Sequence, residues 1–368
     1  MKPLYISATQ QDAGKTTLMI GLVQALRDLG LDTGYMKPIG QRYVRYEGLN
    51  VDEDAVLARE AFRLADSPED MSPIAIERGF TEHYIFNRDP HPLEWRILEA
   101  FGRIREAHGL LIIEGTGHAG VGSCFDLSNA RVAELMGAPV VIITDGGIGR
   151  AIDEAALSLH LFRKHGVNVL GIILNKVWPE KQTKIARAVA QGLQHLGTRL
   201  LGTVPYRPQL VQPRMDQILA ELHGTLLSGN EAIGNRIEHT VVAAMEPHHV
   251  CAYLRENTLV VTPGDRVDNI LISTLMCPMI PGAGGPVAGM VLTGGFEPPA
   301  GVRSLLASTG VPVVLCQEDT FSVATRLRDL RFKIRPEDTD KIEAAKGLVS
   351  RSIDVQALME MLADEPFA

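Results

Sequence analysis

The chain has 368 residues, of which 45% are hydrophobic and 22% are charged, so it can bury a sizeable core. Compact domains typically hold about 100–200 residues, and this length therefore favours two domains. The formal net charge of −8 argues against a nucleic-acid-binding protein, which would need a basic surface. No stretch approaches the roughly 18–20 apolar residues that span a bilayer, and the N-terminus has no signal-peptide pattern. We therefore expect a cytoplasmic protein without membrane contact.

The first 40 residues follow the pattern of a βαβ unit. Residues 4–8 form a short apolar run that predicts a buried strand, and residues 16–29 repeat apolar positions at helical spacing. Gly30 offers a helix stop, and residues 34–36 predict the next strand. This order implies a parallel sheet with a right-handed crossover.

Further apolar runs extend the same pattern over residues 1–210. They lie at residues 110–113, 140–143, 169–174 and 200–204. Continuous apolar runs of this kind are typical of parallel strands that helices cover on both faces. We therefore predict a doubly wound α/β domain, in which ligands bind at the carboxyl ends of the strands.

The second half of the chain predicts a smaller α/β domain at residues 211–333. Strands are expected at residues 241–244, 259–261, 288–292 and 311–315, and helices at residues 268–276 and 301–308. Residues 334–368 are set apart as a helical C-terminal tail, with two surface helices at 338–349 and 355–362. The four cysteines are far apart and form no C-x-x-C pair, which favours neither a disulfide framework nor a zinc site.

Residues 9–17 carry the strongest chemical signal, because a Gly-Lys-Thr sequence opens the first helix directly after a strand. Gly14 lets the backbone approach a phosphate closely, and the amides of the helix N-terminus supply positive potential. Lys15 is expected to reach the β- and γ-phosphates as a catalytic cation, and Thr16 to offer its hydroxyl to Mg²⁺. The common pattern G-x-x-x-x-G-K-[ST] has glycine where this chain has Thr9. The predicted nucleotide contacts in this loop are Thr9, Asp12, Ala13, Gly14, Lys15, Thr16 and Thr17.

Two carboxylates and a lysine complete the predicted phosphate and metal site. Glu114 ends an apolar strand and precedes glycine, which suits a second contact to Mg²⁺. Asp54 is another candidate for the metal or its waters, and the alternative is a solvated helix start whose carboxylates complement the helix dipole. Lys37 precedes Pro38 after the second strand and is expected to lie over the same phosphates as a catalytic residue, with a plain surface lysine as the alternative.

Three other polar residues follow predicted strands. Asn175 is expected to contact the nucleotide base, because its side-chain amide is both donor and acceptor. Arg150, in a glycine-rich loop, is expected either near the phosphates or at a subunit interface. His118 lies beside the Glu114 loop, as a general base or as part of the loop packing.

Two glycine-containing loops follow strands of the second half, at residues 262–268 and 293–295. In the first, Gly264 permits an unusual backbone angle and Asp265 or Asp268 can cap the next helix. Together the loops either line a crevice for a small metabolite or form tight structural turns.

On these residues the first half resembles the dethiobiotin synthetase branch of P-loop proteins, which includes the cobyrinic acid a,c-diamide synthases. The residues that carry this resemblance are the loop at 9–17, Lys37-Pro38, Asp54 and Glu114-Gly115. The resemblance implies that ATP and Mg²⁺ bind at Lys15, Thr16, Asp54 and Glu114. Relatives of this branch often place the site near a dimer interface, so it also implies a homodimer.

A narrower resemblance joins both halves. Residues 114–118, 125–129 and 146–150 are similar to the dethiobiotin-synthetase-like region of long bacterial phosphate acetyltransferases. The second half resembles the DRTGG domain that follows this region in the same enzymes, on residues 264–268, 292–295 and 319–321. In those enzymes the acetyltransferase domain comes next, and this sequence stops at Ala368, so we expect no acetyl transfer to phosphate by this chain alone.

Two functions remain open from the sequence. The first is a metabolic regulatory or sensor module with weak ATPase activity, in which the second domain responds to a metabolite or partner. The second is an ATP-dependent ligase, in which a substrate carboxylate or carbamate attacks the γ-phosphate and an amine closes on the mixed anhydride. Synthetases of the branch carry a serine-glycine loop after Lys-Pro and a glycine at the His118 position, whereas this chain has Ile39-Gly40-Gln41 and His118. The retained Lys37 and Glu114 favour the ligase, whereas these departures and the appended second domain favour the regulatory function, to which we give a slight preference.

Overall fold

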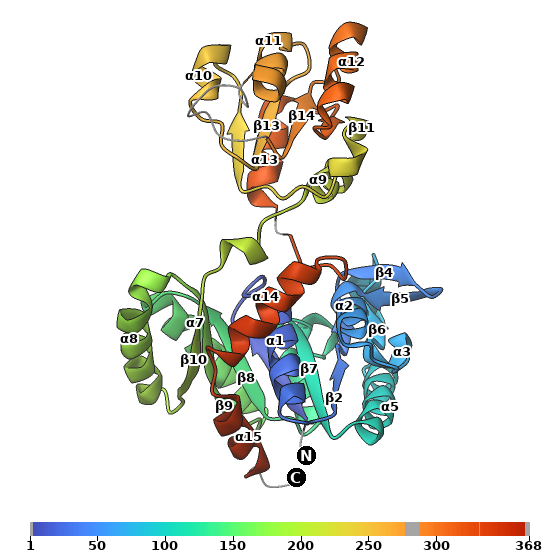
Figure 1. Cartoon of the computed structure of the whole chain (residues 1–368). Coiled ribbons are helices and arrows are strands. Elements are labelled where there is room, and N and C mark those ends of the chain that lie inside the picture. The colour runs from blue at the N-terminus through green and yellow to red at the C-terminus, as the bar shows by residue number, and fades with distance from the viewer. Residues whose placement is uncertain (1–2, 277–286, 331, 365–368) are drawn as a thin grey trace. The chain divides into compact units, whose positions relative to one another are not determined.

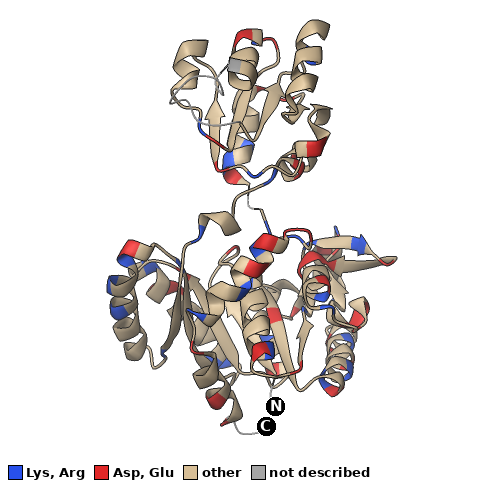
Figure 2. Ribbon diagram, in the orientation of Figure 1, with Lys and Arg blue, Asp and Glu red and all other residues tan. Residues whose placement is uncertain are grey.

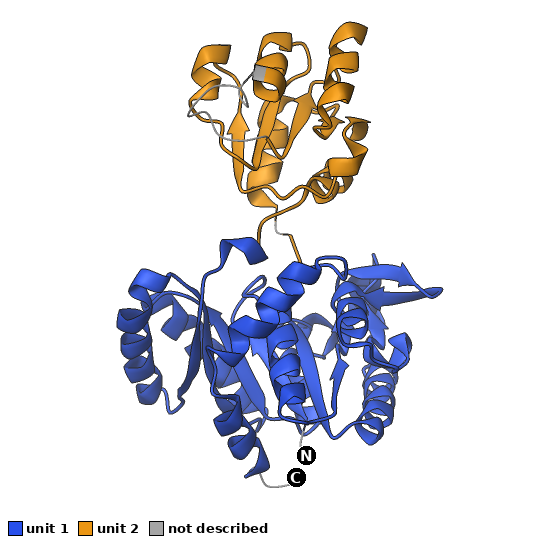
Figure 3. Cartoon of the chain, viewed as in Figure 1, with its two compact units in different colours: residues 1–210, 334–368 blue, residues 211–333 orange. Residues whose placement is uncertain are grey.

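The computed structural model describes residues 3–276, 287–330 and 332–364 (Figure 1). The chain forms two compact units (Figure 3). Unit 1 comprises residues 1–210 and 334–368, and unit 2 comprises residues 211–333. Unit 2 is therefore inserted, in sequence, between the last strand of unit 1 and its C-terminal helices.

A six-stranded sheet forms the centre of unit 1, and all its neighbouring strands pair in parallel. In spatial order the strands are β10 (Leu200–Pro205), β9 (Val169–Val177), β8 (Val140–Asp145), β1 (Leu4–Ala8), β7 (Leu110–His118) and β2 (Thr33–Met36). The predicted α/β class, the strands and the parallel pairing are confirmed. Charged residues are few in these six strands, which are mostly tan in Figure 2: Glu114 lies in the middle of β7, Asp145 is the last residue of β8 and Lys176 is the second-last residue of β9.

The connections between these strands contain helices and short strands. The helices are α1 (Lys15–Asp28), α2 (Glu53–Phe62), α3 (Pro68–Met71), α4 (Phe80–Phe86), α5 (His91–Ala107), α6 (Asn129–Leu135), α7 (Gly149–Lys164) and α8 (Gln182–His195). The short strands are β3 (Ile39–Gly40), β4 (Tyr43–Tyr46), β5 (Leu49–Asp52) and β6 (Ile74–Ala75). Single 3₁₀ turns are η1 (Ser123–Phe125), η2 (Pro179–Lys181) and η3 (Pro208–Leu210).

The C-terminal helices α14 (Thr339–Ser350) and α15 (Val355–Ala363) complete unit 1. The chain runs from β1 to β2 in one direction across the sheet and from β2 through β7, β8 and β9 to β10 in the other. With right-handed crossovers, α1 therefore covers one face and α5 to α8 the opposite face. Helices α14 and α15 contact α1, and α15 contacts β9, so they fill the face that α1 alone would leave open (Figure 1).

The expected surface tail is therefore part of the unit 1 core. Ala345 and Val349 of α14 and Leu358 of α15 are fully buried. Gly21 of α1 permits the close contact with α14, because a Cβ at this position would lie 2.2 Å from a methyl group of Val349. The sequence does show the apolar spacing of these helices, but their partner helix lies more than 300 residues earlier in the chain.

Unit 2 has a five-stranded sheet with one antiparallel edge strand. In spatial order its strands are β11 (Thr225–Ser228), β15 (Val313–Leu315), β14 (Gly289–Thr293), β13 (Thr258–Pro263) and β12 (His239–Val242). Its helical elements are α9 (Met215–Glu221), η4 (Asn230–Ala232), α10 (Pro247–Cys251), α11 (Val267–Leu271), the π-helical turn η5 (Ile272–Met276), α12 (Ala300–Thr309) and α13 (Thr320–Asp329). Successive residues of β13 alternate between two hydrophobic clusters, with Val260 in one and Leu259 and Val261 in the other. The sheet is thus covered on both faces.

The edge strand β11 and helix α13 were missed by the sequence prediction. Cys124, Cys251 and Cys316 carry free thiols, and the fourth cysteine, Cys277, lies outside the described residues. Within residues 3–276, 287–330 and 332–364, no helix combines the length and the apolar character that crossing a membrane requires.

Candidate functional site

The phosphate-loop sequence lies between the carboxyl end of β1 and the start of α1, at the centre of the sheet. Gly14 is the N-cap of α1 and has a left-handed backbone with φ of 87°. Its missing side chain is also needed sterically, because a Cβ would lie 2.3 Å from Nδ2 of Asn175. Asn175 in turn donates from Nδ2 to the backbone oxygen of Ala13 at 2.8 Å. The end of β9 therefore supports the inner half of the loop.

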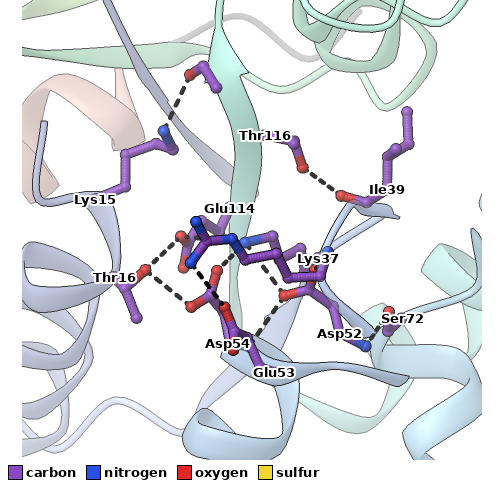
Figure 4. A network of polar contacts seen from close by, with 12 residues as sticks. Lys15, Thr16, Lys37, Ile39, Asp52, Glu53, Asp54, Ser72, Glu114 and Thr116 are labelled. Carbon is purple, nitrogen blue, oxygen red and sulfur yellow. Dashed lines mark hydrogen bonds and ion pairs between the residues drawn. The ribbon is translucent and has the colours of Figure 1, made fainter. Parts of the chain in front are cut away.

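Lys15 and Thr16 begin α1 and point toward β7. The ammonium of Lys15 is largely buried and donates to the backbone oxygen of Gly117 at 3.0 Å. The hydroxyl of Thr16 lies 3.0 Å from Oε1 of Glu114 and 3.1 Å from Oδ1 of Asp54. The hydroxyl of Thr16 on α1 is thus within hydrogen-bond distance of the two other predicted metal-site residues, Glu114 on β7 and Asp54 on α2 (Figure 4).

Lys37 lies at the centre of an acidic cluster formed by Asp52, Asp54 and Glu114 (Figure 4). Its ammonium donates to Asp54 and lies 3.3 Å from Oδ1 of Asp52 and 3.6 Å from Oε1 of Glu114. All four side chains are at most 5% exposed. The alternative of a surface lysine is therefore wrong.

Local structure explains how these groups meet. Lys37 follows β2, which is next to β7 and its Glu114 in the sheet. Asp52 is the N-cap of α2 and accepts from the backbone amide of Asp54 at 3.0 Å, so both carboxylates are fixed at one helix start. Tyr35 of β2 donates its hydroxyl to Oε2 of Glu114 at 3.0 Å.

The electrostatics of the cluster keep Lys37 charged. Burial alone would lower the pKa of Lys37, but Asp54, Glu114 and Asp52 raise it well above its ordinary value. Burial and the Glu114 carboxylate raise the pKa of Tyr35, which keeps its phenol protonated as the donor to Glu114. Without the Lys37 ammonium, the buried carboxylates of Asp52, Asp54 and Glu114 would lose the cation that lies between them.

The oxygen atoms at Thr16 suit a hard divalent cation. Mg²⁺ is usually bound by one or two carboxylates together with phosphate oxygens and water, and the Asp54, Glu114 and Thr16 oxygens are donors of this class. No group of three or more His, Cys, Asp or Glu side chains in the described part of the chain forms a metal site by itself. In this structure the Lys37 ammonium provides the positive charge between the carboxylates.

The other predicted residues lie around this centre in different ways. Arg150 donates to Gln10 at 2.5 Å, at the outer side of the phosphate loop. His118 is exposed, and its Nδ1 accepts from the backbone amide of Gly120 at 3.2 Å. This contact within the loop agrees with the alternative that His118 takes part in the loop packing. Thr17 is the third residue of α1.

Sequence reasoning missed three contributors. Asp52 was not singled out from the sequence, although its position directly before a helix marks it as an N-cap. Tyr35 was included in a strand without a role. Lys176, which follows Asn175, donates to the backbone oxygen of Asp12 and so supports the phosphate loop.

The two glycine loops of unit 2 are tightly packed structural turns in this structure. A Cβ on Gly264 would lie 1.8 Å from the backbone oxygen of Phe296. Gly294 and Gly295 both have positive φ, and their amides donate to backbone oxygens that follow β15. Asp319 caps α13 through the amides of Phe321 and Ser322.

Comparison with known protein families matches both units. The family model AAA_26, described as an AAA domain, matches residues 2–214, more than half of the chain. The chain belongs to the AAA_26 family. A second model, the DRTGG domain, matches residues 217–330. The resemblance inferred from the sequence, a dethiobiotin-synthetase-like P-loop domain followed by a DRTGG domain, is thereby confirmed.

Curated relatives of this AAA_26 protein include phosphate acetyltransferases. That of Nitratidesulfovibrio vulgaris is 27% identical over 365 residues, which cover 96% of this chain and 51% of the relative. That of Synechocystis sp. is 28% identical over 373 residues, which cover 98% of this chain and 51% of the relative. The chain thus spans about half the length of the curated relatives it matches.

Solved structures resemble the AAA_26 protein more weakly. The MinC:MinD cell division protein complex of Aquifex aeolicus matches with a TM-score of 0.38 and 16% identity, over 57% of this chain and 84% of that chain. The CBS and DRTGG domains of the regulatory region of Clostridium perfringens pyrophosphatase, complexed with the activator diadenosine tetraphosphate, match with a TM-score of 0.26 and 17% identity. This second match covers 33% of this chain and 46% of that chain.

Proposed function

We propose that unit 1 binds Mg-ATP and that the protein is a metabolic regulatory or sensor module with weak ATPase activity. The observation that carries the proposal is the meeting of Lys15 and Thr16, at the start of α1, with the carboxylates of Asp54 and Glu114. A helix N-terminus with a P-loop lysine binds phosphate, and a P-loop threonine with acidic residues binds the accompanying Mg²⁺.

The residues divide between phosphate and metal. Thr9, Asp12, Ala13, Gly14, Lys15, Thr16 and Thr17 would line the phosphates, with Asn175 toward the base. Thr16, Asp54 and Glu114 would hold Mg²⁺, which would offset the charge on the phosphates when bound. Lys15 and Lys37 would stabilise charge on a transferring phosphoryl group.

The regulatory assignment rests on the combination of units. The short strand β3 packs on Thr116, whose hydroxyl donates to the backbone oxygen of Ile39. This contact occupies the region in which the resembling synthetases carry a substrate loop. Unit 2 would bind a metabolite or partner. If two conformations of the protein differ in their affinity for that ligand and for ATP, binding at unit 2 would change the affinity for ATP. We also propose a homodimer, by analogy with the resembling branch.

An ATP-dependent ligase of the dethiobiotin synthetase or cobyrinic acid a,c-diamide synthase type is the second candidate. The buried Lys37 favours it, because a lysine beside the metal site serves phosphoryl transfer rather than binding alone.

Phosphate release from ATP distinguishes the two functions. It is measured with and without a panel of diamines, small carboxylates and acetyl phosphate, with Lys15→Ala as the blank. The regulatory function predicts slow release that no panel member stimulates more than about twofold. Strong stimulation by a carboxylate–amine pair, lost in Lys15→Ala, would instead support the ligase.

A further inference from the structure

The outer half of the phosphate loop, residues 9–12, contains no glycine. Thr9 occupies the first glycine position, and Gly14 is the first glycine of the loop. Asp12 nevertheless has a left-handed backbone with φ of 60°. For a non-glycine residue this conformation costs on the order of 1–2 kcal/mol, although Asp tolerates it better than most residues. Contacts elsewhere must therefore hold the loop in place.

Helix α7 holds the first end of this segment. The hydroxyl of Thr9 donates to Oε2 of Glu154 at 2.9 Å. The other oxygen of Glu154 accepts from Nε of Arg150 at 2.6 Å. Thr9 is 9% exposed, so its hydroxyl depends on protein partners.

The contacts continue from Arg150 through the side-chain amide of Gln10. Oε1 of Gln10 accepts from Nη2 of Arg150 at 2.5 Å, and Nε2 of Gln10 donates to Oδ2 of Asp145 at 2.5 Å. Both ends of the amide are therefore occupied. Asp145 is the last residue of β8, next to β1 in the sheet.

Lys176 closes the ring at the other end of the segment. Its ammonium lies 3.5 Å from Oδ1 of Asp145 and donates to the backbone oxygen of Asp12, the residue with positive φ. The ring thus runs from Thr9 to Asp12 through five side chains, namely those of Glu154, Arg150, Gln10, Asp145 and Lys176. Two of these are cations and two are anions, so the ring adds no net charge beside the proposed phosphate site.

We propose that this ring holds the glycine-free segment in its conformation, and that Glu154 and Lys176 are positioning residues for nucleotide binding. They fix the two ends of residues 9–12 so that the backbone amides face the phosphates before the ligand arrives. The inference rests on the proposed Mg-ATP site and names residues outside the P-loop motif on which its affinity depends.

Calorimetric titration of Mg-ATP into single variants tests the ring. Lys176→Met and Glu154→Ala should each weaken binding about tenfold, the effect expected for loss of one charge-assisted hydrogen bond. Lys176→Arg and Glu154→Gln keep a donor and an acceptor and should stay within about threefold of the wild type. Lys184→Met, at an exposed lysine of α8, is the matched control and should bind as the wild type does.

A double variant separates loop positioning from general damage to the fold. Glycine adopts positive φ without cost, so Asp12→Gly should restore most of the affinity that Lys176→Met loses. Failure of this rescue would overturn the positioning role of Lys176. Unchanged affinity in Lys176→Met and Glu154→Ala, with binding lost in Lys15→Ala, would overturn the ring alone. Unchanged affinity in Lys15→Ala would overturn the proposed nucleotide site itself.

Discussion

Replacement of Lys37 by methionine tests the electrostatics of the acidic cluster. Methionine fills a similar volume but removes the charge that faces Asp52, Asp54 and Glu114. A surface ion pair contributes only about 0–1 kcal/mol to the free energy of unfolding. These carboxylates are only 1–2% exposed, so the larger cost of breaking a buried ion pair applies here. Leaving buried charge without its partner costs about 3–5 kcal/mol. We expect Lys37→Met to lose about that much free energy of unfolding in unit 1.

Magnesium should reverse much of this loss. If the cation occupies the place of the ammonium, it binds the folded variant and stabilises it by about 2.7 kcal/mol at 100 times its dissociation constant. The wild type should gain little from Mg²⁺ without nucleotide, because Lys37 already neutralises the carboxylates.

Urea unfolding without Mg²⁺ and with Mg²⁺ at about 100 times its dissociation constant for the variant, followed by circular dichroism, measures both effects. Lys341→Met is the matched control. Lys341 is also a buried lysine, 1% exposed, but it lies on α14 with Asp338 as its acidic neighbour at 3.9 Å. This control should be destabilised with no recovery in Mg²⁺. Equal destabilisation of Lys37→Met in both buffers would refute the idea that the lysine stands in for the metal.

Three further predictions follow from individual positions. Gly21→Ala would push a methyl group into α14 and should lower the free energy of unfolding by about 1–3 kcal/mol. Gly102→Ala, at a position of α5 with open space around it, should raise it by about 0.5–1 kcal/mol. Equal effects of the two substitutions in urea unfolding would contradict the packing of α14 against α1. Gly14→Ala places a methyl group 2.3 Å from a neighbouring amide and strains φ, so Mg-ATP affinity should fall at least tenfold by calorimetry, and retained affinity would argue against this loop geometry. Burial opposes charge on His108, but hydrogen bonds to Asp66 and Asp32 raise the pKa of its imidazole above the ordinary value. The protonated imidazole therefore stabilises the folded state fully below about pH 6.5, and this stabilisation is lost as the pH rises through the pKa of the folded state. The destabilisation caused by His108→Gln should therefore shrink between pH 6 and pH 9, and a constant difference would contradict it.

Local patterns in the sequence were enough to predict the P-loop half of the fold. The first strand, the helix that begins at Gly-Lys-Thr and the next strand follow one another in sequence. The spacing of their apolar residues and the residues that start and stop the helix therefore identify them. Glu114 and Asp54 were also predictable, because an acidic residue at a strand end or a helix start is a local signal. The structure brings both to the hydroxyl of Thr16.

Contacts between distant segments could not be predicted in the same way. Lys37 was expected over the phosphates, yet its burial among three carboxylates depends on how β2, β7 and the start of α2 meet. The C-terminal helices show an apolar face in sequence, but nothing local identifies α1 as its partner. The ring around residues 9–12 likewise joins three segments that lie more than 100 residues from the loop.

The most direct measurement is the calorimetric titration of Mg-ATP into the wild-type protein and Lys15→Ala. The wild type should bind saturably with one nucleotide per chain, and the variant should lose at least tenfold in affinity because the buried ammonium no longer reaches the phosphates. Binding of equal affinity by both proteins, or no binding by the wild type, would contradict a nucleotide site at the start of α1.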